Sequence, residues 1–254
     1  MRAIVLAAGY ATRLRPLTDV TAKQLLPVGG RPMIDWVCER IETVTRDIHV
    51  VTNARFAEEF RRWAAGRDDV TVHDDGTVSN EDRLGAIGDI AFVLERTGVD
   101  DDLLVVAGDN LFDFDLSDFA AFADGKGVAS AVAVYDCGDL ELATHYGVVE
   151  TDSDSRVIGF EEKPSEPRST LVATAAYLYH RGHAALVDGY LADGNPPDQP
   201  GRLIAWLSAR EPVYAYRFAG TWFDIGNPDQ LLEADNRWRE RVGLPRRETY
   251  SPVG

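Results

Sequence analysis

A cluster of phosphate-binding residue types follows the first apolar run of the chain, residues 3–8. Small residues let the backbone approach a ligand closely, and hydroxyl, guanidinium and ammonium groups donate hydrogen bonds or positive charge. Residues 1–31 carry five basic side chains and one acidic one, although the whole chain has a formal net charge of -16. The residues that we expect to contact a phosphate-rich ligand such as a triphosphate are Ala8, Gly9, Thr12, Arg13 and Lys23. A chance cluster of charges on a solvated loop is the alternative.

The spacing of small residues in this loop excludes two common phosphate-binding motifs. No Gly-Lys-Ser/Thr follows at the distance that a P-loop requires. Ala11 stands where the G-x-G-x-x-G motif needs its second glycine. A P-loop NTPase and a dinucleotide-binding oxidoreductase therefore both lose support.

An aspartate follows an apolar run in the middle of the chain. Residues 103–107 predict a buried strand that ends at Gly108 and brings Asp109 to the carboxyl edge of a sheet, where open α/β folds bind ligands. Magnesium typically takes one or two carboxylates, with water and substrate phosphate as its other ligands. Asp109 could therefore begin a magnesium site. The alternative is that Asp109 and Asn110 only form a turn after the strand.

The elements that must position these residues can be read from hydrophobic periodicity. Short β-branched runs alternate with segments of helical period, as over residues 34–44, and this predicts a Rossmann-like, mostly parallel mixed sheet flanked by helices. After residue 135 closely spaced strands predict an antiparallel lobe. A loop is expected over residues 194–201 and a helix from about 228 to 241. The predicted strands are residues 3–8, 48–52, 103–107, 128–135, 147–151, 157–160 and 172–179.

Composition limits the classes of partner. The chain has 254 residues, enough for a substantial core, and its negative charge disfavours nucleic acid and anionic lipid. Cys38 and Cys137 are too few for a disulfide framework and lie in no zinc-binding pattern. No apolar run approaches the length of a membrane span. We expect a soluble cytoplasmic protein that binds neither nucleic acid nor membrane.

Residues 6–32, LAAGYATRLRPLTDVTAKQLLPVGGRP, resemble the signature of the sugar-1-phosphate nucleotidylyltransferases, among them glucose-1-phosphate thymidylyltransferase. The resemblance extends over residues 1–241 and implies the fold of the nucleotide-diphospho-sugar transferases in a single domain. It implies a nucleotide-binding part at about 1–135, a sugar-phosphate-binding part at about 136–241 and a tail at 242–254. A β-helix acyltransferase domain is not expected, and many relatives form homo-oligomers.

The activity implied by this resemblance is Mg²⁺-dependent transfer of a nucleoside monophosphate from an NTP to a sugar 1-phosphate, with release of pyrophosphate. The sequence Lys-Gln-Leu-Leu-Pro at residues 23–27 is similar to thymidylyltransferases and favours dTTP, with UTP next. By resemblance Arg13, Lys23 and Asp109 are catalytic, and Asp109 and Asp224 are the metal ligands. Lys23 and Lys163 are two of only three lysines in the chain.

Two further segments are assigned by the resemblance. Residues 79–88 are expected to open a helix capped by Ser79 or Asn80 and to read the base, with Gly85 in contact and Asn80 as the nearest amide. The alternative is that Gly85 and Gly88 only allow tight packing of that helix. The residues placed at the sugar phosphate are Tyr146, Gly147, Glu162, Lys163 and Trp222. An ordinary exposed charge run is the alternative for residues 161–163.

Alanine replaces a family glycine at two positions. Ala11 is tolerable if the backbone there does not require a positive φ, and Ala175 raises the prospect that the acceptor is not glucose 1-phosphate. Two other functions remain open: a cytidylyltransferase for phosphocholine or another non-sugar acceptor, and a regulator that binds a nucleotide without catalysis.

Overall fold

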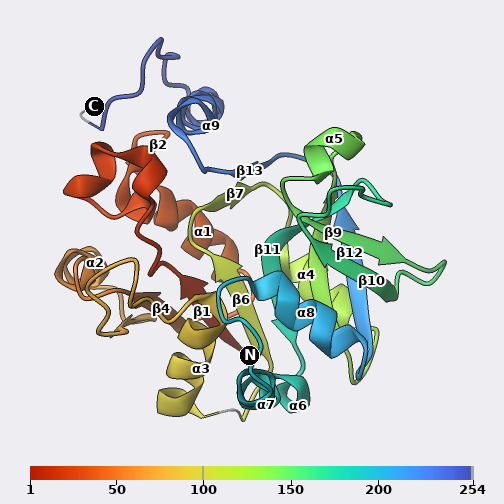
Figure 1. Ribbon diagram of the computed structural model, residues 1–254. Helices are drawn as coiled ribbons and strands as arrows, with labels where there is room; N and C mark the ends of the chain where they lie inside the picture. The colour runs from red at the N-terminus through yellow and green to blue at the C-terminus, as the bar shows by residue number, and fades with distance from the viewer. Residues whose placement is uncertain (99, 253–254) are drawn as a thin grey trace.

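A nine-stranded mixed sheet forms the centre of the computed structural model, which describes residues 1–98 and 100–252 (Figure 1). Its strands are β1 (Arg2–Leu6), β4 (Ile48–Thr52), β5 (Val70–Asp74), β6 (Leu103–Ala107), β8 (Ser130–Asp136), β9 (Gly147–Thr151), β10 (Val157–Glu162), β11 (Leu171–Tyr179) and β12 (Val213–Phe218). The order is β10-β9-β11-β6-β1-β4-β5, and β8 pairs with both β11 and β12. Strands β5, β4, β1 and β6 are parallel, whereas β11 is antiparallel to β6, β8 and β9.

Helices cover both faces of the sheet, because successive side chains of a strand point to opposite faces. From β1, Ala3 and Val5 pack in the cluster that contains α1, α2, α4 and α9, while Ile4 and Leu6 pack in the cluster that contains α3, α7 and α8. The helices are α1 (Met33–Ile41), α2 (Ala57–Ala64), α3 (Ala86–Thr97), α4 (Leu116–Asp124), α5 (Leu140–Ala143), α6 (Arg181–Ala184), α7 (Val187–Ala192), α8 (Pro200–Ser208) and α9 (Pro228–Arg241).

Two small ladders lie outside the main sheet. Strand β7 (Asn110–Phe112) pairs antiparallel with β13 (Trp222–Asp224), and β2 (Pro27–Val28) pairs with β3 (Arg31–Pro32). Short 3₁₀ turns at Thr12–Leu14, Leu17–Asp19 and Lys23–Leu25 carry the chain from β1 to β2. The first ladder brings the segment after β6 beside a segment near the end of the chain.

The seven predicted strands all form, with changes of one or two residues at some ends, and the predicted last helix begins and ends as expected. The antiparallel lobe is confirmed for β9, β10 and β11. The predicted loop over residues 194–201 is too long, because Pro200 and Gly201 already belong to α8, where proline suits the first turn.

The helix predicted to open within residues 79–88 begins only at Ala86, so the predicted cap at Ser79 or Asn80 is wrong. The carboxylate of Asp82 accepts hydrogen bonds from the backbone amides of Val78 and Ser79, so this segment is a loop. Helix α3 begins at Ala86, after Gly85 with φ of 80°. A Cβ on Gly85 would lie 2.7 Å from the carbonyl oxygen of Pro197, so tight packing is one reason for glycine at this position.

No helix in the described ranges, 1–98 and 100–252, is long and apolar enough to span a membrane. Cys38 is buried, Cys137 is partly exposed, and both are free thiols.

Candidate active site

A cavity of about 370 Å³ opens at the carboxyl ends of β1 and β6 and is called the strand-end pocket below. Its volume is typical of small-molecule sites, and this edge of an open α/β sheet is where ligands bind. The loop after β1, the start of α3, the turn after β6, strands β9 to β11 and the segment before α8 all contribute to its wall. The predicted site residues that line it are Ala8, Gly9, Gly85, Asp109, Tyr146, Gly147, Glu162, Lys163, Trp222 and Asp224.

The loop after β1 is held by side chains from other segments. Asn53 Nδ2 donates to the Ala8 carbonyl oxygen at 2.8 Å, and the Thr18 hydroxyl donates to the Ala11 carbonyl oxygen at 2.9 Å. Ala11 has φ of 45°, so the backbone does adopt the left-handed conformation that favours glycine. The departure from the family glycine therefore carries local strain.

The basic residues of the loop lie beside the pocket rather than in its wall. Thr12, Arg13 and Lys23 line a second cavity of about 210 Å³ together with Gly226. Lys23 connects the two cavities, because its Nζ donates to Asp109 Oδ2 at 2.7 Å. An elongated ligand could therefore extend from the strand-end pocket past Lys23 to Arg13.

Asn80, the amide expected near the base, is not in the wall of the strand-end pocket. It is exposed and lines a different cavity with Tyr10, Thr12, Arg15 and Arg55. The loop formed around Asp82, instead of a helix, accounts for this position. Asn80 as a base contact stays a prediction without geometric support.

Charged and polar side chains form a connected group at the β6–β7 turn. The Asn110 side chain donates to Asp109 Oδ1 at 3.0 Å and accepts from Trp222 Nε1 at 2.8 Å. Lys23 is 6% exposed and its ammonium pairs with Asp109. Burial by itself would raise the pKa of Asp109, but the charge and hydrogen bond of Lys23 reverse this, and the pKa lies below its usual value. Asp109 is therefore held as a carboxylate.

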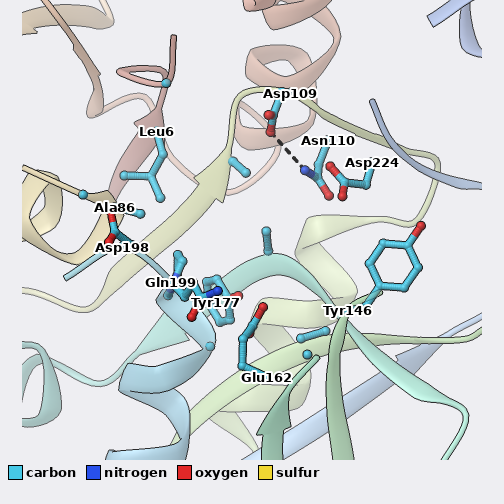
Figure 2. A pocket seen from close by; sticks show the side chains of 18 of the residues that line it. Leu6, Ala86, Asp109, Asn110, Tyr146, Glu162, Tyr177, Asp198, Gln199 and Asp224 are labelled. Atoms are coloured by element: carbon cyan, nitrogen blue, oxygen red, sulfur yellow. Dashed lines mark hydrogen bonds between the residues drawn. The ribbon is translucent and has the colours of Figure 1, made fainter. Parts of the chain in front are cut away.

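The second aspartate arrives on β13, where Asp224 is paired in register with Asn110 (Figure 2). The pKa of Asp224 is raised, first by burial and then by the negative charge of Asp109. The two predicted metal ligands are thus close enough to interact. No group of three or more His, Cys, Asp or Glu converges in the part of the chain that the structure describes. Two carboxylates fit the usual protein share of a magnesium site.

The opposite wall of the pocket combines an acid, a base and aromatic rings. Burial raises the pKa of Glu162, although Lys163 and Arg202 oppose this. Lys163 has φ of 50°, and its N–H donates to the Tyr146 carbonyl oxygen at 3.0 Å. The rings of Tyr146 and Trp222 meet edge to face at 5.0 Å.

A glycine is required beside this wall. A Cβ on Gly147 would lie 2.6 Å from the Phe160 ring, and β9 pairs there with β10, Gly147 opposite Glu162. This contact fixes the position from which Glu162 and Lys163 face the cavity. The sequence assigned Gly147 to a sugar hydroxyl, and the structure shows an additional packing reason for glycine.

Sequence reasoning missed several residues of the pocket wall. The sequence could have indicated Asp89, because it is the only charged residue among residues 86–94, which are otherwise apolar or small. No sequence pattern indicated Asp198 and Gln199, because their position in the pocket wall depends on the packing of the segment before α8 against Gly85. The missed wall residues with polar side chains include Gln24, Asp89, Asn110, Tyr177, Asp198 and Gln199.

Known proteins that are similar to this chain are nucleotidyl transferases. The model of the family described as nucleotidyl transferase matches residues 2–241. The chain is 26% identical over 242 residues to the bifunctional protein GlmU of Methanocaldococcus jannaschii, covering 95% of this chain and 55% of that protein. It is 31% identical over 246 residues to the UTP--glucose-1-phosphate uridylyltransferase of Synechocystis, covering 92% of this chain and 62% of that protein. The chain thus spans less than two thirds of the length of these relatives.

A solved structure from Bacillus anthracis has the same fold. It was provisionally assigned as a glucose-1-phosphate thymidylyltransferase and contains a sucrose. The TM-score is 0.79 at 24% sequence identity, covering 94% of this chain and 96% of that chain. At this identity the likeness concerns the fold, and it confirms the predicted architecture.

Proposed function

The chain belongs to the nucleotidyl transferase family, and from that premise we propose that it joins an NTP to a sugar 1-phosphate and releases pyrophosphate. The observation that supports this most is the convergence of the loop after β1, Asp109 and Asp224 at one pocket, with Lys23 paired to Asp109 beside it. The relative from Synechocystis is named for UTP and glucose 1-phosphate. A buried lysine between two cavities suits a long polyanion.

The reaction needs placement and charge more than a strong base. A phosphate monoester is mostly a dianion near neutral pH, because its second pKa is about 6, so its oxygen can attack the α-phosphorus directly. Arg13 and Lys23 would stabilise charge that moves onto pyrophosphate, and Lys163 would offset repulsion between the two anions. Asp109 and Asp224 would hold Mg²⁺, which supplies neutralisation of phosphate charge when bound.

Lys23 has a double role in this proposal. In the structure its ammonium neutralises Asp109 at 2.7 Å. Asp109 would hold the cation in place of this ion pair, and the Lys23 ammonium would then be free to bind the triphosphate. The cation would thus replace the Lys23 ammonium as the positive charge beside Asp109, and Asp109 would not be left unpaired.

The nucleobase favoured by the residues 23–27 is thymine, with uracil next. The acceptor is proposed to be a hexose 1-phosphate bound against Glu162 and Lys163. A non-sugar acceptor such as phosphocholine is the second candidate, and Ala175 is the residue that keeps it open. Its φ of 53° in the wall of the pocket shows a methyl group at a position that favours glycine.

The test is pyrophosphate release with dTTP, UTP, CTP, GTP and ATP, each combined with several hexose 1-phosphates and with phosphocholine. We expect release that requires Mg²⁺, is stopped by a chelator and falls at least about a hundredfold in Asp109→Asn. The exposed Asp124 at the end of α4 provides the matched control, Asp124→Asn, which should keep activity. Release only with CTP and phosphocholine would establish the second candidate. Tight NTP binding without pyrophosphate release in any combination of NTP and acceptor would contradict the transferase activity and favour a regulator.

A further inference from the structure

A second acidic pair has one member in the wall of the strand-end pocket, away from Asp109 and Asp224. Asp89, in the first turn of α3, is 5% exposed and lines the strand-end pocket, and Asp75 directly follows β5. Their carboxyl groups lie close enough to interact with each other. In the described chain, Asp89 Oδ1 and Asp75 Oδ2 are buried, and neither accepts a hydrogen bond from a donor group. Two carboxylates contain no donor, so a hydrogen bond between them requires a shared proton.

Side chains connect this pair to the loop after β1. Asp75 Oδ1 accepts from the Thr77 backbone amide and from the Thr77 hydroxyl, both at 2.7 Å. The Thr77 hydroxyl lies 3.4 Å from the Tyr10 hydroxyl, and Tyr10 follows Gly9. Since Thr77 donates to Asp75, Tyr10 is the donor in this contact. The acidic pair is therefore linked by hydrogen bonds to the wall that Gly9 forms.

The same pair is also connected to the part of the pocket wall that contains Gly85. The Asp89 backbone amide donates to the Gly85 carbonyl oxygen at 2.8 Å, and both residues line the pocket. The Asp75 backbone amide donates to the Thr52 carbonyl oxygen at 2.9 Å, at the end of β4. The carboxyl contact thus joins α3 to the sheet edge and sets the position of Gly85 relative to Gly9.

We infer that Asp89 is a positioning residue for the nucleoside triphosphate: as a neutral acid that donates to Asp75, it fixes the two walls that flank the base and its phosphates. This rests on the proposed function, because Gly9 and Gly85 are predicted nucleotide contacts only if the chain binds an NTP as its family resemblance implies. The inference goes further by naming which groups hold that half of the site and which substrate they serve. The sugar-side wall, at Glu162 and Lys163, has no part in it.

The electrostatics of the surrounding groups agree with a neutral Asp89. Burial raises its pKa to about 8, and the charge of Asp75 adds to this. Burial also raises the pKa of Asp75, and Asp74 adds to that. Tyr10 has a raised pKa, mainly through burial. The other charged groups around the pair, its network and the adjoining rim are Asp74, Asp82, Arg55, Arg83 and Asp198, and the last two pair with each other at 3.0 Å.

Loss of the shared proton should therefore separate the walls. Above about pH 8 the pair would carry two negative charges in contact, and repulsion would disfavour the arrangement that binds NTP. The apparent affinity falls with the fraction of the binding-competent state, which corresponds to roughly a fivefold loss between pH 8 and pH 9. Asp89→Asn can still donate to Asp75 and cannot ionise, so this variant should retain its affinity over that range.

The experiment measures dTTP and UTP binding by calorimetry from pH 6 to 10 in wild type, Asp89→Asn, Asp89→Ala and the control Asp124→Asn. Where turnover is found, KM for NTP, KM for the acceptor and kcat are measured as well. We expect wild type and Asp124→Asn to lose NTP affinity above pH 8, Asp89→Asn to keep it, and Asp89→Ala to be weak throughout. KM for the acceptor should not follow this pattern.

The carboxyl ¹³C resonance of Asp89 is recorded in the ligand-free protein, so it needs neither turnover nor a known substrate. A titration of Asp89 near pH 4, or an alkaline loss of affinity in Asp89→Asn equal to wild type, would overturn the inference. Absence of turnover with every NTP, combined with the expected titration and binding profile, would overturn the proposed function alone. Circular dichroism of each variant separates these results from unfolding.

Discussion

Two acidic residues in the wall of the strand-end pocket, Asp109 and Asp89, are stabilised in different ways. At the β6–β7 turn Asp109 stays ionised because the Lys23 ammonium lies 2.7 Å away. At the start of α3 Asp89 is neutral at pH 7, because burial and Asp75 raise its pKa to about 8. A buried carboxyl group is costly when charged and unpaired, and either a counter-charge or a proton removes that cost.

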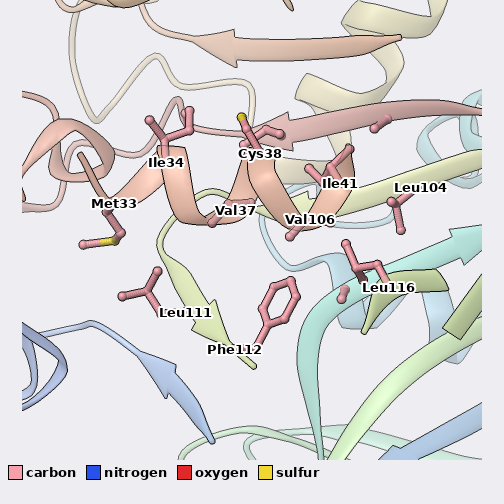
Figure 3. Close-up of a cluster of buried hydrophobic side chains, with 14 of the residues drawn as sticks. Met33, Ile34, Val37, Cys38, Ile41, Leu104, Val106, Leu111, Phe112 and Leu116 are labelled. Carbon is pink, nitrogen blue, oxygen red and sulfur yellow. The ribbon is translucent and has the colours of Figure 1, made fainter. Parts of the chain in front are cut away.

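The difference follows what each place must do. Asp109 faces the end of the pocket where a cation could bind, so a negative charge is useful there. Asp89 supports a wall, so a hydrogen bond without net charge is sufficient. The packing around α1 is a third kind of buried environment, because the cluster around Ile34, Val37 and Ile41 is apolar and, among the described residues, contains no carboxyl group (Figure 3). Of these three environments, only the first has a carboxylate available to a ligand.

Replacing Lys23 by methionine should affect the first acidic group most. We expect turnover to fall about 10²- to 10³-fold, because both the counter-charge of Asp109 and a phosphate contact are lost. Stability should fall by about 2 kcal/mol, less than for a fully buried pair because Asp109 is 29% exposed. Urea unfolding and pyrophosphate release measure the two effects.

The stability difference between wild type and Lys23→Met should depend on pH. The folded pKa of Asp109 is depressed, so its stabilisation is present above pH 4 and is lost as pH falls through the folded value. The stability difference between wild type and Lys23→Met should therefore shrink at acidic pH. An equal difference at pH 3 and pH 7 would contradict a role for this charge pair in stability.

Asp89→Asn should change stability with the opposite pH dependence. The folded pKa of Asp89 is raised, so its contribution is fully present below pH 4 and is lost as pH rises toward about 8. Relative to wild type, the variant should gain stability at up to about 1.4 kcal/mol per pH unit within that window and level off above it. Thermal unfolding at pH 5, 7 and 9 measures this, and a difference that does not grow with pH would exclude a neutral Asp89.

The smallest effect concerns backbone strain in the same pocket rather than charge. Ala11 has φ of 45°, and a non-glycine residue in this conformation costs about 1 kcal/mol. Ala11→Gly should therefore stabilise the protein by somewhat less than that amount, because glycine also loses more conformational freedom on folding. Denaturant unfolding compares Ala11→Gly with Ala11→Val, which should be less stable. Equal stability of both variants would show that the loop does not store strain.

The sequence indicated the first acidic group and not the second, for a physical reason. Asp109 lies in the turn directly after an apolar strand, and the position of parallel strand ends follows from the fold class. Asp89 depends on a contact with Asp75 across the gap between α3 and β5, and no local pattern encodes that contact. A charged residue on the apolar face of α3 was the available signal.

The helix start was misjudged because side chains competed for the same backbone groups. Ser79 and Asn80 are favourable helix caps, but the Asp82 carboxylate takes the amides of Val78 and Ser79 and stabilises a loop. The glycine that ends this loop is fixed by Pro197, far along the chain. Local propensity predicted the strands well because their buried runs agree with the tertiary fold, whereas this segment is decided by distant contacts.

The ladder between β7 and β13 also determines when the site becomes complete during synthesis. Asn110 and Asp224 are paired in register but are far apart in sequence, and such contacts form late because a long loop must close first. A ribosome-bound chain that ends before residue 222 can form β1, β4 and β6 and yet lacks Asp224. An unfinished chain could therefore hold a nucleotide without consuming it, and catalytic competence would begin only with the last part of the domain.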